Sequence, residues 1–240
     1  IKMATPNHRQ ENQRVYILHT YPFKETSLIA EIFSEKFGRI PVVAKGARRP
    51  RSSIRGMLQS FQVLLANWSG KSELKSLNGL EWCEKLTILE GDALMCGFYL
   101  NELMIRLLPR DEPHTELFHF YHETILALSE GRELTITLRR FELKLLQALG
   151  YAVTLDHDED SNPIIPDKMY RYEAEYGACD LTKTDRGMKV LGKTLLDMAN
   201  DQYIDKETQQ QSKQLMRYLL GFYLGDKPLH SKQLFVDLQG

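Results

Sequence analysis

Residues 27–44 read SLIAEIFSEKFGRIPVVA. Side chains in the first half of this segment alternate between two faces, which indicates a β-strand. One face would carry Leu28, Ala30 and Ile32, and the other Ile29, Glu31 and Phe33. Phe37, Gly38 and Arg39 then predict a tight turn into a second apolar run at residues 40–44. The segment is therefore predicted to form a β-hairpin.

Three further segments are rich in strand-forming residues, at 14–23, 61–68 and 74–83. Five strands within about 80 residues indicate a small closed barrel. We favour an OB fold, because such barrels commonly present grooves to single strands. An SH3-like barrel has a similar set of strands and remains open at this point.

After about residue 88 the apolar residues recur at helical spacing. Helices are predicted at 92–108, 113–129, 134–149, 184–199 and 206–224, with a short final helix after residue 229. Residues 151–180 break this pattern with an acidic run and two prolines, followed by a strand-like segment at 168–176. The expected fold class is therefore α+β multidomain, with a barrel domain at 1–84 and a helical domain at 85–240.

Charge is segregated along the chain. The formal net charge is -1, yet no acidic residue lies between Glu35 and Glu73. The basic residues expected to bind a polyanion in this region are Arg39, Lys45, Arg48, Arg49, Arg51, Arg55 and Lys71. Such clustering costs self-repulsion, which phosphates would offset. Residues 45–55, called here the basic loop, contain Gly46 and Pro50 and are predicted to form a flexible loop.

Size and composition indicate a folded intracellular protein. The 240 residues are 42% hydrophobic, and no apolar run approaches the roughly 18–20 residues that span a bilayer. The three cysteines, Cys83, Cys96 and Cys179, lie far apart, which favours a reduced compartment over a disulfide framework. The N-terminal residues show no secretory signal. We expect a cytoplasmic protein that does not bind membranes.

The helix predicted at 134–149 carries two apolar faces when its residues are placed at 100° intervals. The core face holds Leu138, Phe141, Leu145, Ala148 and Leu149. A second stripe combines Arg139 with Leu143 and Leu146. Either this stripe packs under a neighbouring helix, or it forms a docking groove for an apolar peptide end that bears a negative charge.

Patterns typical of enzymes and metal sites fail in this chain. Ser69-Gly70-Lys71-Ser72 lacks the first glycine of a nucleotide-binding P-loop, because Leu65 stands in its place. The aspartates at 156, 158 and 160 are not followed by the glycine and glutamate of a calcium loop. No nucleophile elbow is present. We therefore expect a binding protein, with no catalytic residue, no metal and no cofactor.

Several short segments, taken in order, resemble the RecO family, the bacterial recombination mediators of the RecF pathway. The resemblance runs from about Arg14 to Phe235. Its strongest pieces are Lys24-Glu25-Thr26-Ser27-Leu28, Phe37-Gly38-Arg39, Val43-Ala44-Lys45-Gly46-Ala47-Arg48, Tyr99-Leu100-Asn101-Glu102-Leu103, Leu138-Arg139-Arg140-Phe141-Glu142-Leu143, Leu149-Gly150-Tyr151 and Lys227-Pro228-Leu229-His230-Ser231. Their order and spacing together make the match specific.

The resemblance implies an N-terminal OB fold, a helical domain and a knuckle-like insertion, here at about 152–181. It also implies DNA repair and recombination functions. These are binding of single- and double-stranded DNA, annealing of complementary strands, and cooperation with RecR in loading RecA onto DNA coated by single-strand-binding protein (SSB). Such a protein would associate with the nucleoid.

The knuckle of many relatives is held by four cysteines on zinc, whereas residues 152–181 contain only Cys179. The chain therefore resembles the zinc-free branch, and zinc ligands are not expected. In that branch the acidic tail of SSB docks on the helix that matches 138–149. Transfer by position implies that Arg139 pairs with the tail carboxylate, while Leu143 and Leu146 line an apolar pocket.

Two rival functions remain at this stage. One is a protein–protein adaptor whose basic loop binds acidic peptides. The other is a nuclease, which the absence of a carboxylate cluster beside the basic residues disfavours.

Overall fold

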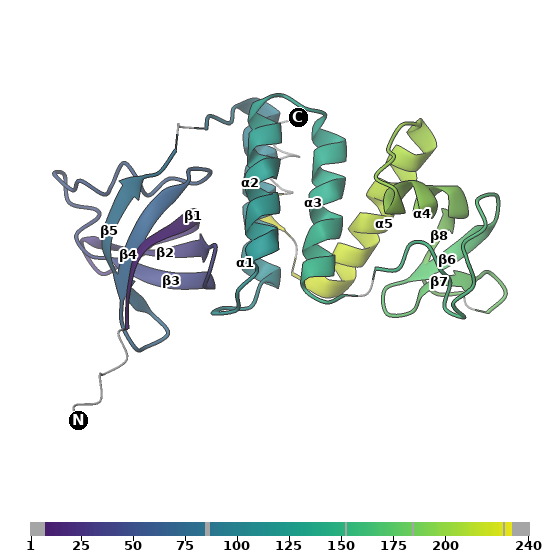
Figure 1. Cartoon of the computed structure of the whole chain (residues 1–240), viewed down its shortest axis with the longest axis horizontal. Helices are drawn as coiled ribbons and strands as arrows, with labels where there is room; N and C mark the ends of the chain where they lie inside the picture. The colour runs from purple at the N-terminus through teal and green to yellow at the C-terminus, as the bar shows by residue number, and fades with distance from the viewer. Residues whose placement is uncertain (1–7, 85–86, 152, 184, 228, 232–240) are drawn as a thin grey trace. The chain divides into compact units, whose positions relative to one another are not determined.

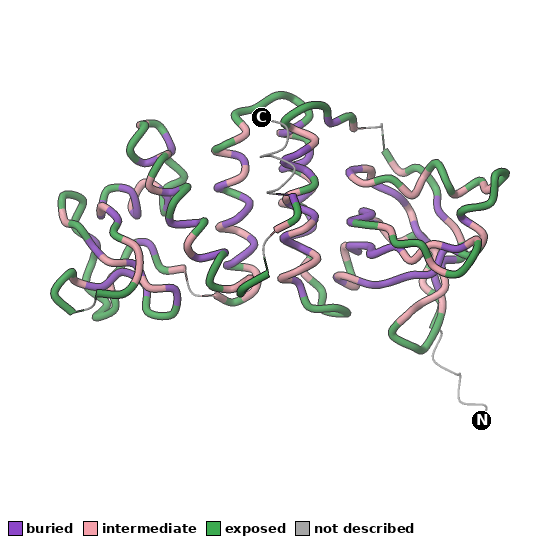
Figure 2. The backbone as a smooth tube through the Cα atoms, turned by 180° about the vertical axis from the view of Figure 1, so that it is seen from behind, coloured by how far each residue is buried: buried purple, intermediate pink, exposed green. Residues whose placement is uncertain are grey.

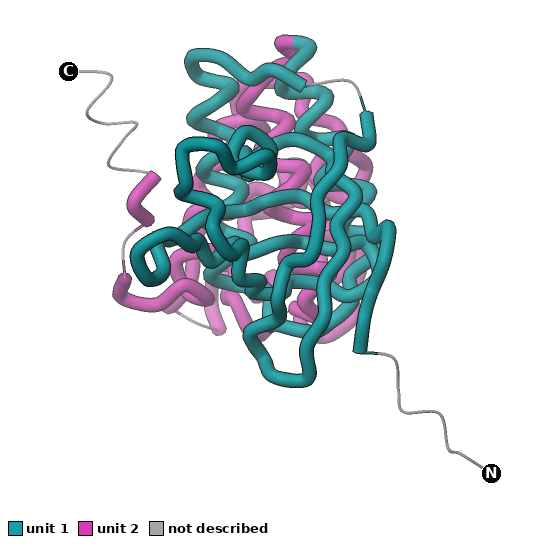
Figure 3. The backbone as a smooth tube through the Cα atoms, turned by 90° about the vertical axis from the view of Figure 1, so that its left-hand side faces the viewer, with its two compact units in different colours: residues 1–130, 233–240 teal, residues 131–232 magenta. Residues whose placement is uncertain are grey.

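The protein is described here from a computed structural model, which covers residues 8–84, 87–151, 153–183, 185–227 and 229–231 (Figure 1). Within these residues a closed five-stranded barrel precedes five helices and a small three-stranded sheet. This arrangement confirms the predicted α+β class. The chain divides into two compact units, the first ending at Glu130 and the second spanning Gly131–Lys232 (Figure 3).

The barrel strands are β1 (Arg9–Phe23), β2 (Ser27–Ser34), β3 (Gly38–Ala44), β4 (Leu64–Ser69) and β5 (Lys75–Trp82). They close in the order β1-β2-β3-β5-β4, with β4 pairing back onto β1. β3 and β5 are parallel, and every other neighbouring pair is antiparallel. This order is that of an OB-like barrel, which settles the choice left open by the sequence.

Alternation along the strands fills the barrel. The interior holds small and branched apolar side chains, as the pattern of residues 28–32 predicted. They include Val15, Ile17, Ala30, Ile32, Ile40, Val42, Leu64, Ala66 and Trp68, all at most 2% exposed (Figure 2). The opposite face of β1 and β2 is apolar near α2 (Thr115–Ser129), where Tyr16 and Phe33 pack on Phe118 with ring centroids 5.5 Å apart.

The turn at residues 37–39 packs against the segment that follows α1 (Gly91–Leu107) and holds it in position. Gly38 has φ +71°, and a Cβ there would lie 1.8 Å from the carbonyl oxygen of Glu112. Only glycine therefore permits both this backbone conformation and this close approach. The backbone of Arg39 accepts a hydrogen bond from the N–H of Asp111 at 2.9 Å.

A buried carboxylate joins the same elements. Glu31, 3% exposed, lies on the outer face of β2 and pairs with Arg39 at 2.9 Å. It also pairs with Arg110, which makes a second ion pair with Glu73 at 2.5 Å. The Nε of Arg39 donates to the carbonyl of Leu108 at 3.0 Å. These contacts, called here the Glu31 cluster, tie the end of α1 to the barrel.

The sequence expected a domain boundary at residue 84, which is close to the end of β5. The compact units divide later, because α1 and α2 group with the barrel. The Glu31 cluster and the buried amide of Asn101, which donates to the carbonyl of Leu18 at 2.9 Å, account for this grouping.

The second unit contains α3 (Leu134–Ala148), α4 (Gly192–Ala199), α5 (Lys206–Leu224) and a sheet in the order β7-β6-β8. The strands are β6 (Met169–Glu173), β7 (Gly177–Asp180) and β8 (Met188–Leu191). The helix predicted to start at residue 184 instead begins at Gly192, since residues 188–191 pair with β6. That part of the prediction is wrong. The predicted final helix lies largely outside the described residues.

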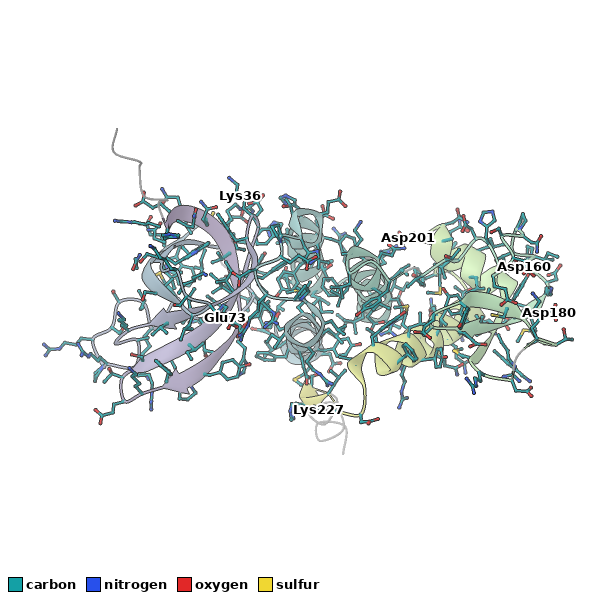
Figure 4. The ribbon with its side chains drawn as sticks, turned by 90° about the horizontal axis from the view of Figure 1, so that it is seen from below. Lys36, Glu73, Asp160, Asp180, Asp201 and Lys227 are labelled. Carbon is teal, nitrogen blue, oxygen red and sulfur yellow. The ribbon has the colours of Figure 1, made fainter. Side chains whose placement is uncertain are left out.

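Hydrogen bonds and buried tyrosines hold the knuckle-like segment. The Asp158 carboxylate accepts from the backbone N–H groups of Asp160 and Asn162, at 3.0 and 2.9 Å. Tyr170 and Tyr172 are 1% exposed, and the hydroxyl of Tyr172 donates to the Thr154 carbonyl at 3.0 Å. Two lysines also pair with aspartates labelled in Figure 4, Lys183 with Asp160 at 2.5 Å and Lys168 with Asp180 at 2.8 Å.

Glu31→Ala is expected to destabilise the first unit by about 3–5 kcal/mol, because it leaves the half-buried Arg39 guanidinium without its carboxylate. The matched control is Glu73→Ala, which removes the exposed partner of Arg110 and should cost no more than about 1 kcal/mol. Urea unfolding of both variants measures the difference. Equal small effects would show that the Glu31 cluster is not a structural tie.

Acidic pH should weaken the start of α5. A hydrogen bond from Lys193 and one from the Thr208 N–H lower the pKa of Asp205 from 3.8 to about 2. A lowered folded-state pKa stabilises the protein above pH 3.8, and this contribution is lost as the pH falls towards about 2.

Asp205→Asn should therefore flatten the fall in melting temperature over this pH range. The control is Asp167→Asn, since the Asp167 side chain is exposed and makes no ion pair within the described chain. Parallel melting curves of the wild type and both variants test this. If Asp205→Asn followed the wild-type pH profile, the Asp205 carboxylate at the start of α5 would not contribute to the loss of stability in acid.

Candidate nucleic-acid interface and the α3 stripe

The basic loop is built from successive hydrogen-bonded turns. The N–H groups of Arg49, Ser52 and Arg55 donate to the carbonyls three residues earlier, at 3.0, 3.1 and 3.4 Å. Met57 continues the series by donating to the Ile54 carbonyl at 3.0 Å. The segment therefore has a defined path between β3 and β4.

Apolar residues anchor this path to the barrel. Ala47 is fully buried, and Ile54, Met57 and Leu58 pack against the barrel interior. The backbone N–H of Arg48 donates to the Thr26 carbonyl at 2.8 Å, which ties the loop to the β1–β2 turn. The sequence predicted a flexible loop here, and the structure corrects this to an anchored one.

The loop presents its cations to solvent. Lys45, Arg48, Arg49, Arg51 and Arg55 are exposed, as is Lys71 in the β4–β5 turn. None of the six makes an ion pair with another described residue. Arg48 also donates from its guanidinium to the Lys24 carbonyl at 3.4 Å. These six are called here the basic face, and their charges remain available to an anionic ligand.

Arg39 does not belong to the basic face. Its side chain is 12% exposed and is committed to Glu31 and the Leu108 carbonyl. The prediction that Arg39 binds DNA is therefore not supported, and its role is structural. The sequence did not show this, because Glu31 reaches Arg39 from the neighbouring strand β2 and the Leu108 carbonyl follows Arg39 by 69 residues.

Lys24 is a basic residue that the sequence reasoning missed. It is exposed in the β1–β2 turn, its Nζ lies 5.4 Å from the Phe23 ring centroid, and its carbonyl contacts Arg48. The available signal was the polar segment Lys24-Glu25-Thr26 between two strand-like runs.

The second stripe of α3 (Arg139, Leu143 and Leu146), called here the α3 stripe, is more buried than predicted. Leu146 is fully buried and Arg139 is 8% exposed, while Leu143 is half-buried. Arg139 donates to the buried Glu142 carboxylate at 2.7 Å and to the Lys213 carbonyl of α5 at 3.4 Å. The expectation of an open pocket lined by Leu146 is therefore corrected, because packing under a neighbouring helix occupies part of the stripe.

The knuckle-like segment offers no assembled metal site within the residues that the structure describes. Cys179 is buried, and burial together with a contact to Glu159 raises the pKa of its thiol to about 12. A raised pKa keeps this interior thiol protonated at neutral pH. None of the helices in the described part of the chain has the length and apolar character needed to cross a membrane.

Comparison with known proteins agrees with this architecture. The family model "Recombination protein O N terminal" matches residues 8–86, and "Recombination protein O C terminal" matches residues 89–233. The first covers the barrel, and the second covers the helices and the small sheet.

Curated relatives match along the whole chain. A DNA repair protein RecO from Nitrosospira multiformis is 51% identical over 240 residues, covering 99% of each chain. The protein of the same description from Dechloromonas aromatica is 46% identical, covering 95% of this chain and 96% of its own. One from Burkholderia pseudomallei is 44% identical, covering 98% and 86%. Both family models match in order along the chain, and relatives of 44–51% identity cover nearly all of it, so the chain belongs to the RecO family of DNA repair proteins.

Proposed function

We propose that this protein is a non-catalytic recombination mediator that binds single- and double-stranded DNA through the basic face of its barrel. The observation that carries this proposal is the set of six exposed cations without ion-pair partners among the described residues. The barrel serves as the DNA-binding domain, and the helical remainder of the chain serves partner binding. Its work would take place on the nucleoid in the cytoplasm.

The chemistry of the basic face favours backbone contacts over base readout. Arginine and lysine side chains neutralise phosphates whatever the sequence. Anchoring of the loop at Ala47 and Thr26 fixes the backbone that carries all of these cations except Lys71. Binding is therefore sequence-tolerant and strongly dependent on salt.

Annealing of complementary strands follows from the same electrostatics. Two DNA strands repel through their phosphates, and cations that neutralise both lower the cost of their approach. No covalent step is involved, so the proposal requires no catalytic group.

The partner-binding part of the proposal concerns α3. The acidic C-terminal tail of SSB would dock beside Leu143, with its carboxylate directed at Arg139. Support comes from the surface that remains there, since Leu143 is half-buried and Arg139 is 8% exposed. Glu142 already engages the same guanidinium, so a tail carboxylate would share Arg139 with it. Through this contact and cooperation with RecR, the protein would promote RecA loading.

The adaptor reading remains the alternative function. The basic face would then bind an acidic peptide, and DNA affinity would be weak at physiological salt. Binding of bare oligonucleotides separates the two readings.

The first prediction of this proposal is a steep salt dependence. Five phosphate contacts on a single strand give a slope of roughly -3.5 for the logarithm of the binding constant against that of salt. Replacing Arg48, Arg49 and Arg51 together with alanine should reduce the slope by about 2. Titration of a labelled oligonucleotide at several salt concentrations measures both values.

A matched control removes the same charge elsewhere. Lys189, Lys206 and Arg217 are exposed in the second unit, and their triple alanine variant should keep the wild-type slope. Equal slopes in the two triple variants would show that DNA binding depends on the net charge of the protein and not on the basic face. A wild-type slope near zero would remove the DNA-binding proposal.

The tail-docking proposal predicts that Leu143→Asp abolishes binding of an acidic C-terminal peptide, because the new carboxylate would be buried without a partner. Leu134→Asp is the control, since Leu134 is half-buried on the opposite side of the same helix, about 180° away. Amidation of the peptide terminus should weaken wild-type binding by about 1.5–3 kcal/mol. Calorimetry measures both. Normal peptide binding by folded Leu143→Asp would place the tail elsewhere.

A further inference from the structure

The outer face of β1 carries three rings at alternate positions, His19, Tyr21 and Phe23, called here the aromatic row. Their cross-strand partners on β2 are Glu31, Ile29 and Ser27. The intervening residues Thr20 and Pro22 stand opposite Ala30 and Leu28, which belong to the barrel interior or pack against it. Alternation along the strand therefore directs the row away from the interior.

The rings of the row are accessible. Tyr21 is 41% exposed and is the central ring, His19 is exposed and Phe23 is half-buried. The His19 and Tyr21 rings meet edge to face, with centroids 4.5 Å apart. The ladder between β1 and β4 ends at Val15, so the row lies beyond that pairing. Residues 19–23 therefore pair with β2 but, within the described chain, not with β4, and they carry three rings in line on the outer face.

The row ends at the basic face. Phe23 is followed by Lys24, whose ammonium lies over the Phe23 ring and whose carbonyl accepts from Arg48. Lys45 follows β3, whose Ala44 pairs with Leu28 of β2. A strand whose phosphates meet Arg48 and Lys45 therefore has its bases within reach of the rings.

The buried acidic group beside the row is neutralised. Glu31 lies opposite His19, and both Arg39 and Arg110 pair with it. Burial raises the pKa of the Tyr21 hydroxyl, with Glu31 adding to the shift, so the phenol stays uncharged at neutral pH. The row thus offers neutral faces beside cations, and Glu25, exposed next to Lys24 in the β1–β2 turn, is a second carboxylate near its Phe23 end.

We propose that the aromatic row is a stacking platform for unpaired bases, with Tyr21 as its central ring, and that it makes this face of the barrel prefer single-stranded over double-stranded DNA. The proposal rests on DNA binding by the basic face. Bases of a single strand expose their π-faces, whereas each base of a duplex is covered by its neighbours. Alternate residues of a strand are roughly 7 Å apart, so successive rings can take successive unstacked bases.

The test uses the full chain and a thymidine oligonucleotide, with a duplex of the same length as second ligand. Tyr21→Ala should weaken single-strand binding roughly 5- to 150-fold, the factor that corresponds to one stacked base. Duplex binding and the salt slope should not change, because no phosphate contact is lost. Tyr21→Phe keeps the ring and should bind like the wild type. Tyr176→Ala is the matched control, since Tyr176 is 66% exposed in the second unit.

A second arm replaces the bases beside the site with abasic residues. Wild-type affinity should fall by a similar factor, and the abasic strand should bind Tyr21→Ala no more weakly than it binds the wild type, since both changes remove one interaction. This arm needs only the wild type to reveal stacking, so it holds if Tyr21→Ala folds poorly.

The outcomes separate the two proposals. If Tyr21→Ala and the abasic strand leave affinity unchanged while the triple arginine variant weakens it, the platform is refuted and DNA binding stands. If the triple arginine variant also leaves DNA affinity unchanged, both proposals fail. Equal loss of single-strand and duplex affinity in Tyr21→Ala would also refute the platform. So would a Tyr21→Ala variant that keeps its DNA affinity and loses only the binding of an acidic peptide.

Discussion

The buried carboxylate of Glu31 is the constraint on which the first unit depends. It lies on the outer face of the barrel, where an unpaired charge would be costly, and two guanidiniums from different parts of the chain compensate it. One of them, Arg110, comes from the segment after α1, so pairing also fixes where the helices meet the barrel. The helices cover the outer face near Tyr16 and Phe33 and leave the region of His19 and Tyr21 exposed.

The strands were predictable because barrel packing requires neighbouring side chains to alternate between the interior and the outer face. Residues 28–33 alternate as a half-buried strand must, and all five barrel segments appear at the predicted places within a few residues. The order of the strands was not predictable, since the parallel pairing of β3 with β5 depends on the path of the intervening chain. The same holds for β8, whose four residues are strand only because β6 lies beside them.

The candidate site shows the same division between local and distant information. The cations of the basic loop were identified from composition, and their exposure follows from the turns and apolar anchors of that loop. Arg39 was misassigned because charge alone does not reveal that a side chain already has partners, here Glu31 on the neighbouring strand and the distant Leu108 carbonyl. Leu146 was misassigned because a second apolar stripe on a helix indicates a packing contact but does not show whether a neighbouring helix or a ligand makes it.

Anchoring of the basic loop has a thermodynamic consequence. A mobile loop would lose backbone and side-chain freedom when it closed on a ligand, and this loss would subtract from affinity. Here Ala47 in the interior and the hydrogen bond from Arg48 to Thr26 settle the backbone before any ligand arrives. The ordering cost is thus met during folding of the barrel, and only the long side chains remain to be ordered on binding. The barrel is preorganised for a polyanion.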